Sequence, residues 1–305
     1  MAFTAKDVAE LRKQTGCGMM DCKKALTEAN GDFAEATKIL REKGMATAAK
    51  KQDRIAAEGV VATLTENGVT AMIEVNTETD FAAKSPAFVG FVNDLLATIV
   101  ANKPASVEEL MAQKTPSGQT AEEALNEVSG TVLREKVSVR RFVIVEGTVS
   151  TYIHGAGETG IVIKFETDVA DHPAFAAFAK NIALQAAAIP ALYVDRDAVP
   201  QSALDEEMEI LKAQMAQDPK FAGKPANVVE GIIRGKMGKY YETNCLVEQA
   251  YVKDDSLTVG KYVAASAKEM GGSIKVVSFV RYDKGEGIEK KEEDFAAEIE
   301  KMVKG

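Results

Sequence analysis

Histidine is scarce in this 305-residue chain, which leaves little room for acid–base catalysis. The only two are His154 and His172, and His172 precedes a proline at a predicted helix start, where a capping or solvated role is expected. No cysteines and histidines have the spacing of a metal site. The sequence therefore offers almost no catalytic residue, and we expect neither a cofactor nor a metal.

Cysteine is also rare, with three in the chain and no paired-motif spacing. Cys17 and Cys22 lie five positions apart, which is too far for a redox pair, in a segment without histidine. We expect free thiols, as in proteins of a reducing cytoplasm.

An excess of basic residues is missing, and so are long apolar runs. The formal net charge of −9 argues against a general nucleic-acid binder. The chain opens without a charged-then-apolar signal segment, and its strongest apolar run, Phe88–Val100, is broken by Asn93 and Asp94. These absences predict a soluble cytoplasmic protein, with no membrane contact, whose partner is another protein.

The first 55 residues predict three short helices and a linker. Thr4 and Asp7 form a capping-box pattern, a second helix is expected over 19–29, and Asp32 caps a third that runs to Lys43-Gly44. A unit this small buries only a thin core, so we interpret it as a docking module, followed by a helical linker over 45–55.

From Gly59 onward the pattern changes to strands. Two strands, 60–64 and 69–75, flank Asn67-Gly68, a hairpin signal, and alternation in the second predicts a half-buried strand. Ser85 and Pro86 open a helix. Further helices are expected over 173–188 and 258–270 and at the Ser106/Glu109 and Thr120/Glu123 capping patterns, and further strands over 137–145, 149–154, 161–165 and 274–282.

Part of this order occurs twice. Glu78-Thr79-Asp80 and Pro86-Ala87-Phe88 are matched by Glu166-Thr167-Asp168 and Pro173-Ala174-Phe175. The repeat indicates two related α+β subdomains. Residues 194–243 interrupt the second copy with two amphipathic helices, predicted to be an antiparallel pair whose exposed face could bind another copy of the chain.

The two copies differ at Phe81, and this difference points to a functional residue. It follows Asp80 on a predicted strand-to-helix loop, whereas the second copy has Val169. Phe81 could fold back onto the core, but one aromatic on a repeated frame favours a contact with a partner.

The segment Gly155–Gly160 matches a dinucleotide-binding pattern of glycines. That pattern requires a helix after it, and Ile161–Phe165 is plainly a strand. We interpret these glycines as a hairpin loop. In the segment 15–26, TGCGMMDCKKAL, one of Met19 and Met20 is expected in the core and the other at the surface.

The segments TGCGMMDCKKAL and EVNTETDFAAK (74–84), with Tyr152-x-His154-Gly155 and the terminal GEGIEKKEEDFAAE, resemble bacterial elongation factor Ts. The resemblance implies an α+β fold with a small three-helix N-terminal domain, a duplicated α+β core, an inserted antiparallel helical pair and a C-terminal helical module. The boundaries expected are 1–55 for the docking domain with its linker, 56–142 for core subdomain N, 143–193 with 244–282 for core subdomain C, 194–243 for the insertion, and 283–305 for the C-terminal module.

The same resemblance implies a guanine nucleotide exchange factor, not an enzyme, acting on the translational GTPase elongation factor Tu. Phe81 would wedge between two helices of the GTPase and disturb its magnesium site. The residues implied in the contact are Thr79, Asp80, Phe81, Met19, Met20, Lys23, His154, Leu133 and Phe295.

One position departs from the family pattern. Before Arg140-Arg141 the family usually has an isoleucine-glycine contact, where this chain has Leu133-Arg134. The apolar half of that contact is expected to survive through Leu133. From the residues alone, two other classes of protein remain possible. One is a helical scaffold or holdase, and the other is a thiol- or nucleotide-dependent enzyme.

Overall fold

The computed structural model describes residues 3–218 and 226–289 and divides into two compact units. Among the described residues, unit 1 contains 3–144, 155–159 and 282–289, and unit 2 contains 145–154, 160–218 and 226–281. Helices and antiparallel strands occupy separate stretches of the chain, so the fold class is α+β, as predicted.

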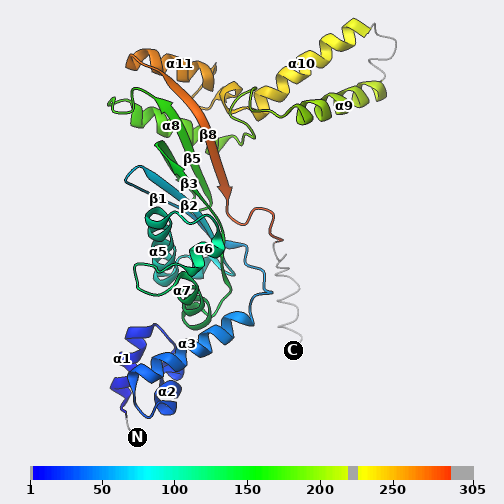
Figure 1. Cartoon of the computed structure of the whole chain (residues 1–305). Coiled ribbons are helices and arrows are strands. Elements are labelled where there is room, and N and C mark those ends of the chain that lie inside the picture. The colour runs from blue at the N-terminus through cyan, green and yellow to red at the C-terminus, as the bar shows by residue number, and fades with distance from the viewer. Residues whose placement is uncertain (1–2, 219–225, 290–305) are drawn as a thin grey trace. The chain divides into compact units, whose positions relative to one another are not determined.

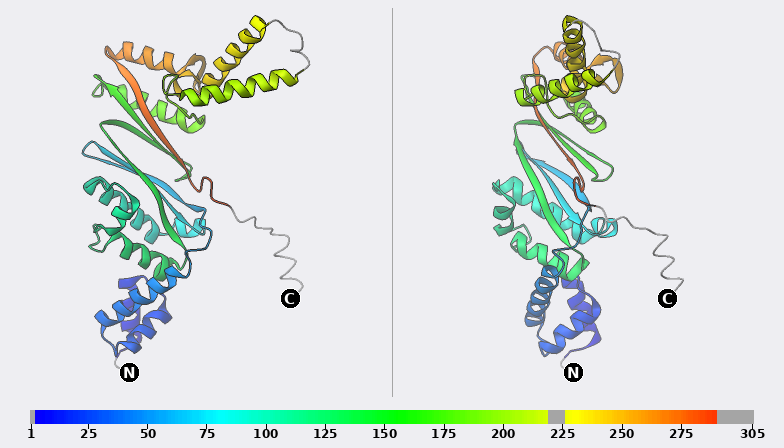
Figure 2. Two further views of the ribbon diagram at one scale, coloured as in Figure 1. Left: turned by 45° about the vertical axis from the view of Figure 1, so that its right-hand side comes forward. Right: turned by 90° about the vertical axis from the view of Figure 1, so that its right-hand side faces the viewer.

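Unit 1 begins with a bundle of three helices, α1 (Ala5–Thr15), α2 (Met19–Glu28) and α3 (Phe33–Ala49) (Figure 2). The capping box at Thr4 and Asp7 is confirmed, and Asp32 caps α3 by accepting a hydrogen bond from the Glu35 backbone. The prediction that the third helix ends at Gly44 was wrong. Helix α3 continues to Ala49 because Gly44 is buried against Gly130, where the missing side chain permits close packing.

The sheet of unit 1 has the order β1-β2-β3, from β1 (Glu58–Glu66), β2 (Val69–Thr77) and β3 (Val137–Glu146). Asn67 and Gly68 both have positive φ and close the predicted hairpin. The expectation of a half-buried β2 was wrong, since all nine of its residues are buried. β2 is the central strand, and the polar residues Glu74 and Asn76 are buried on the face opposite Val69, Ala71, Ile73 and Val75.

Helix α5 (Pro86–Asn102) covers one face of this sheet (Figure 1). Ser85 caps it, as predicted, by accepting a hydrogen bond from the Phe88 backbone at 3.2 Å. Phe88, Leu95 and Ile99 are fully buried in the resulting core. The rest of this layer comprises α4 (Asp80–Ala83), α6 (Val107–Ala112), α7 (Ala121–Glu127) and a π-helix over Val128–Leu133.

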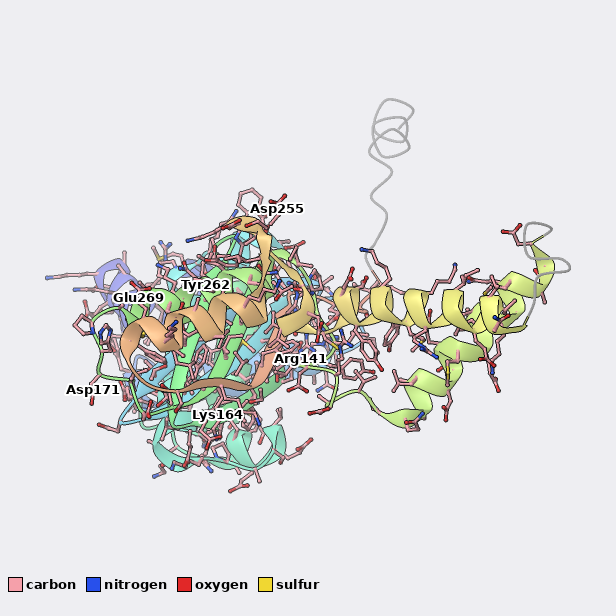
Figure 3. The ribbon with its side chains drawn as sticks, turned by 90° about the horizontal axis from the view of Figure 1, so that it is seen from above. Arg141, Lys164, Asp171, Asp255, Tyr262 and Glu269 are labelled. Carbon is pink, nitrogen blue, oxygen red and sulfur yellow. The ribbon has the colours of Figure 1, made fainter. Side chains whose placement is uncertain are left out.

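Unit 2 has a second three-stranded sheet, β4-β5-β8, with a core of its own. Tyr251 and Tyr262 stack at 4.3 Å between ring centroids, and Figure 3 shows Tyr262 on α11. The elements are β4 (Thr148–His154), β5 (Thr159–Thr167), α8 (Phe175–Ala188), a 3-10 turn (Leu246–Glu248), β6 (Ala250–Tyr251), β7 (Asp254–Thr258), α11 (Val259–Met270) and β8 (Ile274–Asp283).

Helices α9 (Gln201–Gln217) and α10 (Ala226–Asn244) run in opposite directions and extend away from the sheet of unit 2 (Figures 1 and 3). Leu211 and Met215 of α9 are buried, so part of the predicted apolar stripe is used inside the pair. Across the described part of the chain, no helix has the length and apolarity needed to cross a membrane. The helix predicted over 292–303 lies outside the described residues.

The glycine-rich segment 155–160 joins β4 to β5, so its interpretation as a hairpin loop is confirmed. The Gly157 carbonyl accepts a hydrogen bond from the Val61 backbone at 2.8 Å. Gly157 has φ +103°, and a Cβ there would lie 3.0 Å from the Cβ of Val60. Glycine is therefore required at 157 for close packing against β1.

Candidate functional site

Phe81 lies on α4, a single helical turn between β2 and α5. The sequence predicted a loop here, and the difference arises because Thr79 caps the turn by accepting a hydrogen bond from the Ala82 backbone at 3.2 Å. Ala82 and Ala83, the last two residues of α4, are buried, whereas Phe81 is 83% exposed. The alternative in which Phe81 folds onto the core is therefore wrong.

Glu135 holds the segment that precedes Phe81. Its carboxylate accepts hydrogen bonds from the Thr79 hydroxyl at 2.9 Å, from the Thr79 backbone N–H at 3.1 Å and from the Thr77 hydroxyl at 3.3 Å. The Lys136 backbone N–H in turn donates to Glu78 at 2.6 Å. These bonds join the end of β2 to the segment before β3, so the backbone under α4 is fixed from two sides.

Asp80 is paired with Lys84 one turn later, at 2.7 Å. The hydrogen bond from Lys84 holds the pKa of the Asp80 carboxyl below its ordinary value, and the same bond raises the pKa of Lys84. Both groups are exposed, so the pair orients α4 rather than contributing much stability.

A groove runs beside α4, and we call it the Phe81 groove. Three exposed apolar side chains line it, from Ile55, Phe81 and Val89. Charged residues line it as well, among them Lys284, which donates to Glu58 at 2.6 Å. Exposed apolar side chains next to charged ones are typical of a protein-binding surface.

The second copy of the repeat uses the same positions differently. Val169, which corresponds to Phe81, packs against the core of unit 2. The Thr167 hydroxyl donates to the Ser273 carbonyl, and Asp168 accepts from the Ser273 backbone. The repeated frame is thus kept, and only the first copy presents an aromatic ring to solvent.

Comparison with known proteins agrees with the two signature segments. The family model described as elongation factor TS matches residues 78–286. A protein named elongation factor Ts from Clostridium kluyveri is 45% identical over 99% of each chain, and one from Syntrophotalea carbinolica is 43% identical over 100% of each. The chain belongs to the elongation factor Ts family. It is therefore an elongation factor of protein biosynthesis.

Met19, Met20 and Lys23 come together on the solvent side of α2 in this elongation factor Ts family member. Met19 is 43% exposed and Met20 is 61% exposed. The expectation that one of them lies in the core was wrong, because Cys22 and Leu26 fill the buried face of α2 instead. Two adaptable apolar side chains next to a lysine form a second candidate contact surface.

Leu133 packs against the core of unit 1 while remaining partly exposed. Arg134 has φ +58°, a left-handed conformation that favours glycine, which is the residue the family pattern usually has there. Its guanidinium forms an ion pair with Asp21 of α2. The departure at 134 thus links the segment before β3 to the N-terminal bundle.

The two other predicted site residues lie elsewhere. His154 is exposed at the end of β4 in unit 2, and its Nδ1 is 3.1 Å from the Tyr152 hydroxyl. Phe295 lies outside the described residues.

Sequence reasoning missed a buried charge cluster around Glu74, whose side chain is fully buried. Glu74 accepts hydrogen bonds from Arg140 at 2.9 Å, Arg141 at 2.7 Å and the Gly285 backbone at 2.8 Å. Burial opposes ionisation, but these donors outweigh it and lower the pKa of Glu74. Arg141 also lies 4.0 Å above the Tyr282 ring. The signal that could have revealed this cluster is the position of Glu74, a carboxylate within a mostly apolar strand.

The described residues offer no evident catalytic centre. Within 3–218 and 226–289, no three His, Cys, Asp or Glu side chains are grouped to hold a metal ion. Burial raises the pKa of Cys17 to about 11, and that of Cys245 to about 11. Both thiols are protonated at neutral pH, so neither is an activated nucleophile.

Proposed function

We propose that this protein is a guanine nucleotide exchange factor for the translational GTPase elongation factor Tu. Its role is to promote GDP release by displacing elements around the magnesium and phosphate site of that GTPase. The observation that carries this proposal is the position of Phe81, which is 83% exposed on a turn held by Glu135, in a chain of the elongation factor Ts family.

The exposed ring of Phe81 is suited to displacing elements of a partner protein, and it carries no group for enzymatic chemistry. Phe81 enters an apolar crevice of the GTPase, and Thr79 and Asp80 fix its direction. The movement weakens coordination of the magnesium ion, and the diphosphate then loses part of its charge compensation. No covalent step and no cofactor are needed, so the protein acts as a binding factor and not as an enzyme.

Exchange of this kind follows from thermodynamic linkage. A factor that binds the nucleotide-free GTPase more tightly than the loaded form must weaken nucleotide binding by the same ratio. Met19, Met20, Lys23, Leu133, His154 and Phe295 complete the contact in this proposal. Contacts that lie apart from Phe81 supply affinity, while Phe81 supplies the difference between the two states of the GTPase.

The domain plan proposed with this function has five parts. The expected boundaries are retained: 1–55, 56–142, 143–193 with 244–282, 194–243, and 283–305. The two three-stranded sheets support a duplicated core, and the pair α9/α10 supports an insertion, which is also the proposed surface for homodimerisation. The proposed location is the cytoplasm, where translation occurs.

The deciding experiment is stopped-flow release of a fluorescent GDP from elongation factor Tu, with and without this protein. Faster release at substoichiometric amounts of the protein is the expected result. Binding to the GTPase without faster release would favour the scaffold reading, in which the same exposed apolar surfaces hold a partner without changing its nucleotide affinity.

A further inference from the structure

A second pocket in unit 1 lies where the end of α3 meets the π-helix Val128–Leu133. We call it the α3 pocket. Four basic residues and one acidic residue line it: Lys24, Lys43, Lys51, Arg134 and Asp21. It is separate from the Phe81 groove, with which it shares no lining residue.

Two polar groups in the wall of this pocket are buried without partners. Lys51 is 7% exposed, and its ammonium has no hydrogen-bond partner. Thr131 is 8% exposed, and its hydroxyl has none either. Leaving a buried ammonium and a buried hydroxyl unsatisfied costs free energy, and a ligand that accepts hydrogen bonds from both would recover it. Both polar atoms are covered in this conformation, so the two side chains must turn toward the pocket for a ligand to reach them.

The neighbouring charges do not meet this need. Lys51 is influenced by Arg54, Glu78 and Glu135, and its burial lowers its pKa. Glu135 already accepts bonds from Thr77 and Thr79, and Glu78 accepts from Lys136. These carboxylates therefore act on Lys51 only through space.

The other basic groups leave the pocket with a positive balance. Arg134 is paired with Asp21, and Lys43 with Glu28 at 2.7 Å, whereas Lys24 adds a further exposed charge from α2. α3 and the π-helix are in close contact beside the pocket, where a Cβ on Gly130 would come within 2.6 Å of the Gly44 carbonyl carbon. The pocket itself has a volume of about 500 Å³, so it has room for a phosphate group and for part of a molecule that carries one.

We propose that the α3 pocket binds a small phosphate-type oxyanion, with Lys51 and Thr131 as its direct donors and Lys24 and Arg134 as its flanking charges. Phosphate carries several acceptor oxygens in a tetrahedral arrangement, so one ion can accept from an ammonium, a hydroxyl and a guanidinium at once. Binding would link α2, α3 and the π-helix, and it does not depend on the exchange function proposed above.

The test is calorimetric titration of the full chain with inorganic phosphate, against sodium chloride at equal ionic strength. We expect saturable one-site binding of phosphate, and a melting temperature that rises with phosphate but not with chloride. Equal responses to phosphate and chloride would overturn the proposal. A parallel titration with glycerol phosphate distinguishes a phosphorylated molecule from free phosphate as the natural ligand, according to which binds more tightly.

Two variants and one matched control test the donors. Lys51→Met keeps the apolar stem and removes the buried charge, so it is expected to fold and to weaken phosphate binding at least about tenfold. Thr131→Val should weaken binding several-fold. Lys50→Met, at the exposed neighbouring position, should bind as the wild type does. Wild-type affinity in both Lys51→Met and Thr131→Val would refute the assignment, and the wild-type titration decides the matter if a variant fails to fold.

Discussion

Glu135 accepts a hydrogen bond from both the backbone N–H and the hydroxyl of Thr79, across 56 positions of sequence. Thr79 at the same time caps α4. One carboxylate therefore sets the direction of the turn that carries Phe81.

Replacing Phe81 with alanine should leave stability within about 0.5 kcal/mol of the wild type, because the ring is exposed. It should slow stimulated GDP release from elongation factor Tu at least about tenfold, equivalent to about 1.4 kcal/mol. Stopped-flow fluorescence measures this rate. Val252→Ala, at a 44% exposed apolar position of unit 2, is the control and should exchange normally. Normal exchange by a folded Phe81→Ala protein would remove Phe81 from the mechanism.

Raising the magnesium concentration should blunt the stimulation of GDP release. In the proposed mechanism the factor and the cation oppose each other at the phosphate site, so excess cation favours the loaded GTPase. The measurement is the stimulated release rate over a series of magnesium concentrations at constant ionic strength. A stimulation that is indifferent to magnesium would contradict the proposed route, even if exchange itself is confirmed.

Thr79→Val should lower the free energy of unfolding of unit 1 by about 1–2 kcal/mol, because it removes the cap of α4 and one bond to Glu135. It should also slow exchange, since Phe81 is then less firmly directed. Denaturant unfolding measures the first effect. Thr27→Val is the matched control, because its hydroxyl only donates back to Lys23 within α2, and its change should stay within about 0.5 kcal/mol. Equal stability of the two variants would show that the hydrogen bonds of the Thr79 hydroxyl contribute nothing to the stability of unit 1.

Glu74 should make unit 1 sensitive to acid. Its pKa is lower in the folded chain than in the unfolded one, so its contribution is present above about pH 4.3 and is lost as the pH falls through the folded value. Glu74→Gln should cost up to about 3 kcal/mol at pH 7 and flatten the acid limb of the stability curve. Glu66→Gln, at the exposed end of β1, should leave that limb unchanged. An unaltered acid limb in Glu74→Gln would contradict this assignment.

Gly157→Ala should destabilise the protein by about 1–3 kcal/mol, since its φ of +103° and its contact with Val60 both oppose a side chain. Gly238→Ala is the matched control. It lies within α10, where an added Cβ meets nothing within 4 Å, so it should be stabilising by about 0.5–1 kcal/mol. Thermal unfolding of the two variants compares these effects, and equal changes would refute the close-packing argument.

The features that could be predicted are those determined locally. The Thr4/Asp7 capping box, the Asn67-Gly68 turn and the Ser85 cap each depend on residues within a few positions of one another. Such signals need no knowledge of what packs nearby. These local signals correctly predicted most of the order of helices and strands.

The features that were missed depend on distant partners. Nothing near Thr79 in sequence indicates that Glu135 will bond to it, and nothing near Glu74 indicates the donors at Arg141 and Gly285. The burial of both faces of β2 is likewise set by its central place in the sheet. For the same reason the sequence alone allows both a buried and an exposed Phe81, and only the fold of α4 distinguishes them.

The order already present in the turn that carries Phe81 affects the affinity of the proposed complex. Its backbone is already ordered by Thr79, Glu135 and the buried Ala82 before any partner arrives. Only the two side-chain torsions of Phe81 remain free, so little conformational entropy would be lost when the ring binds a partner. In the proposed exchange mechanism, nearly all of the contact energy of such a preorganised ring is therefore available to deform the surface of the GTPase that receives it.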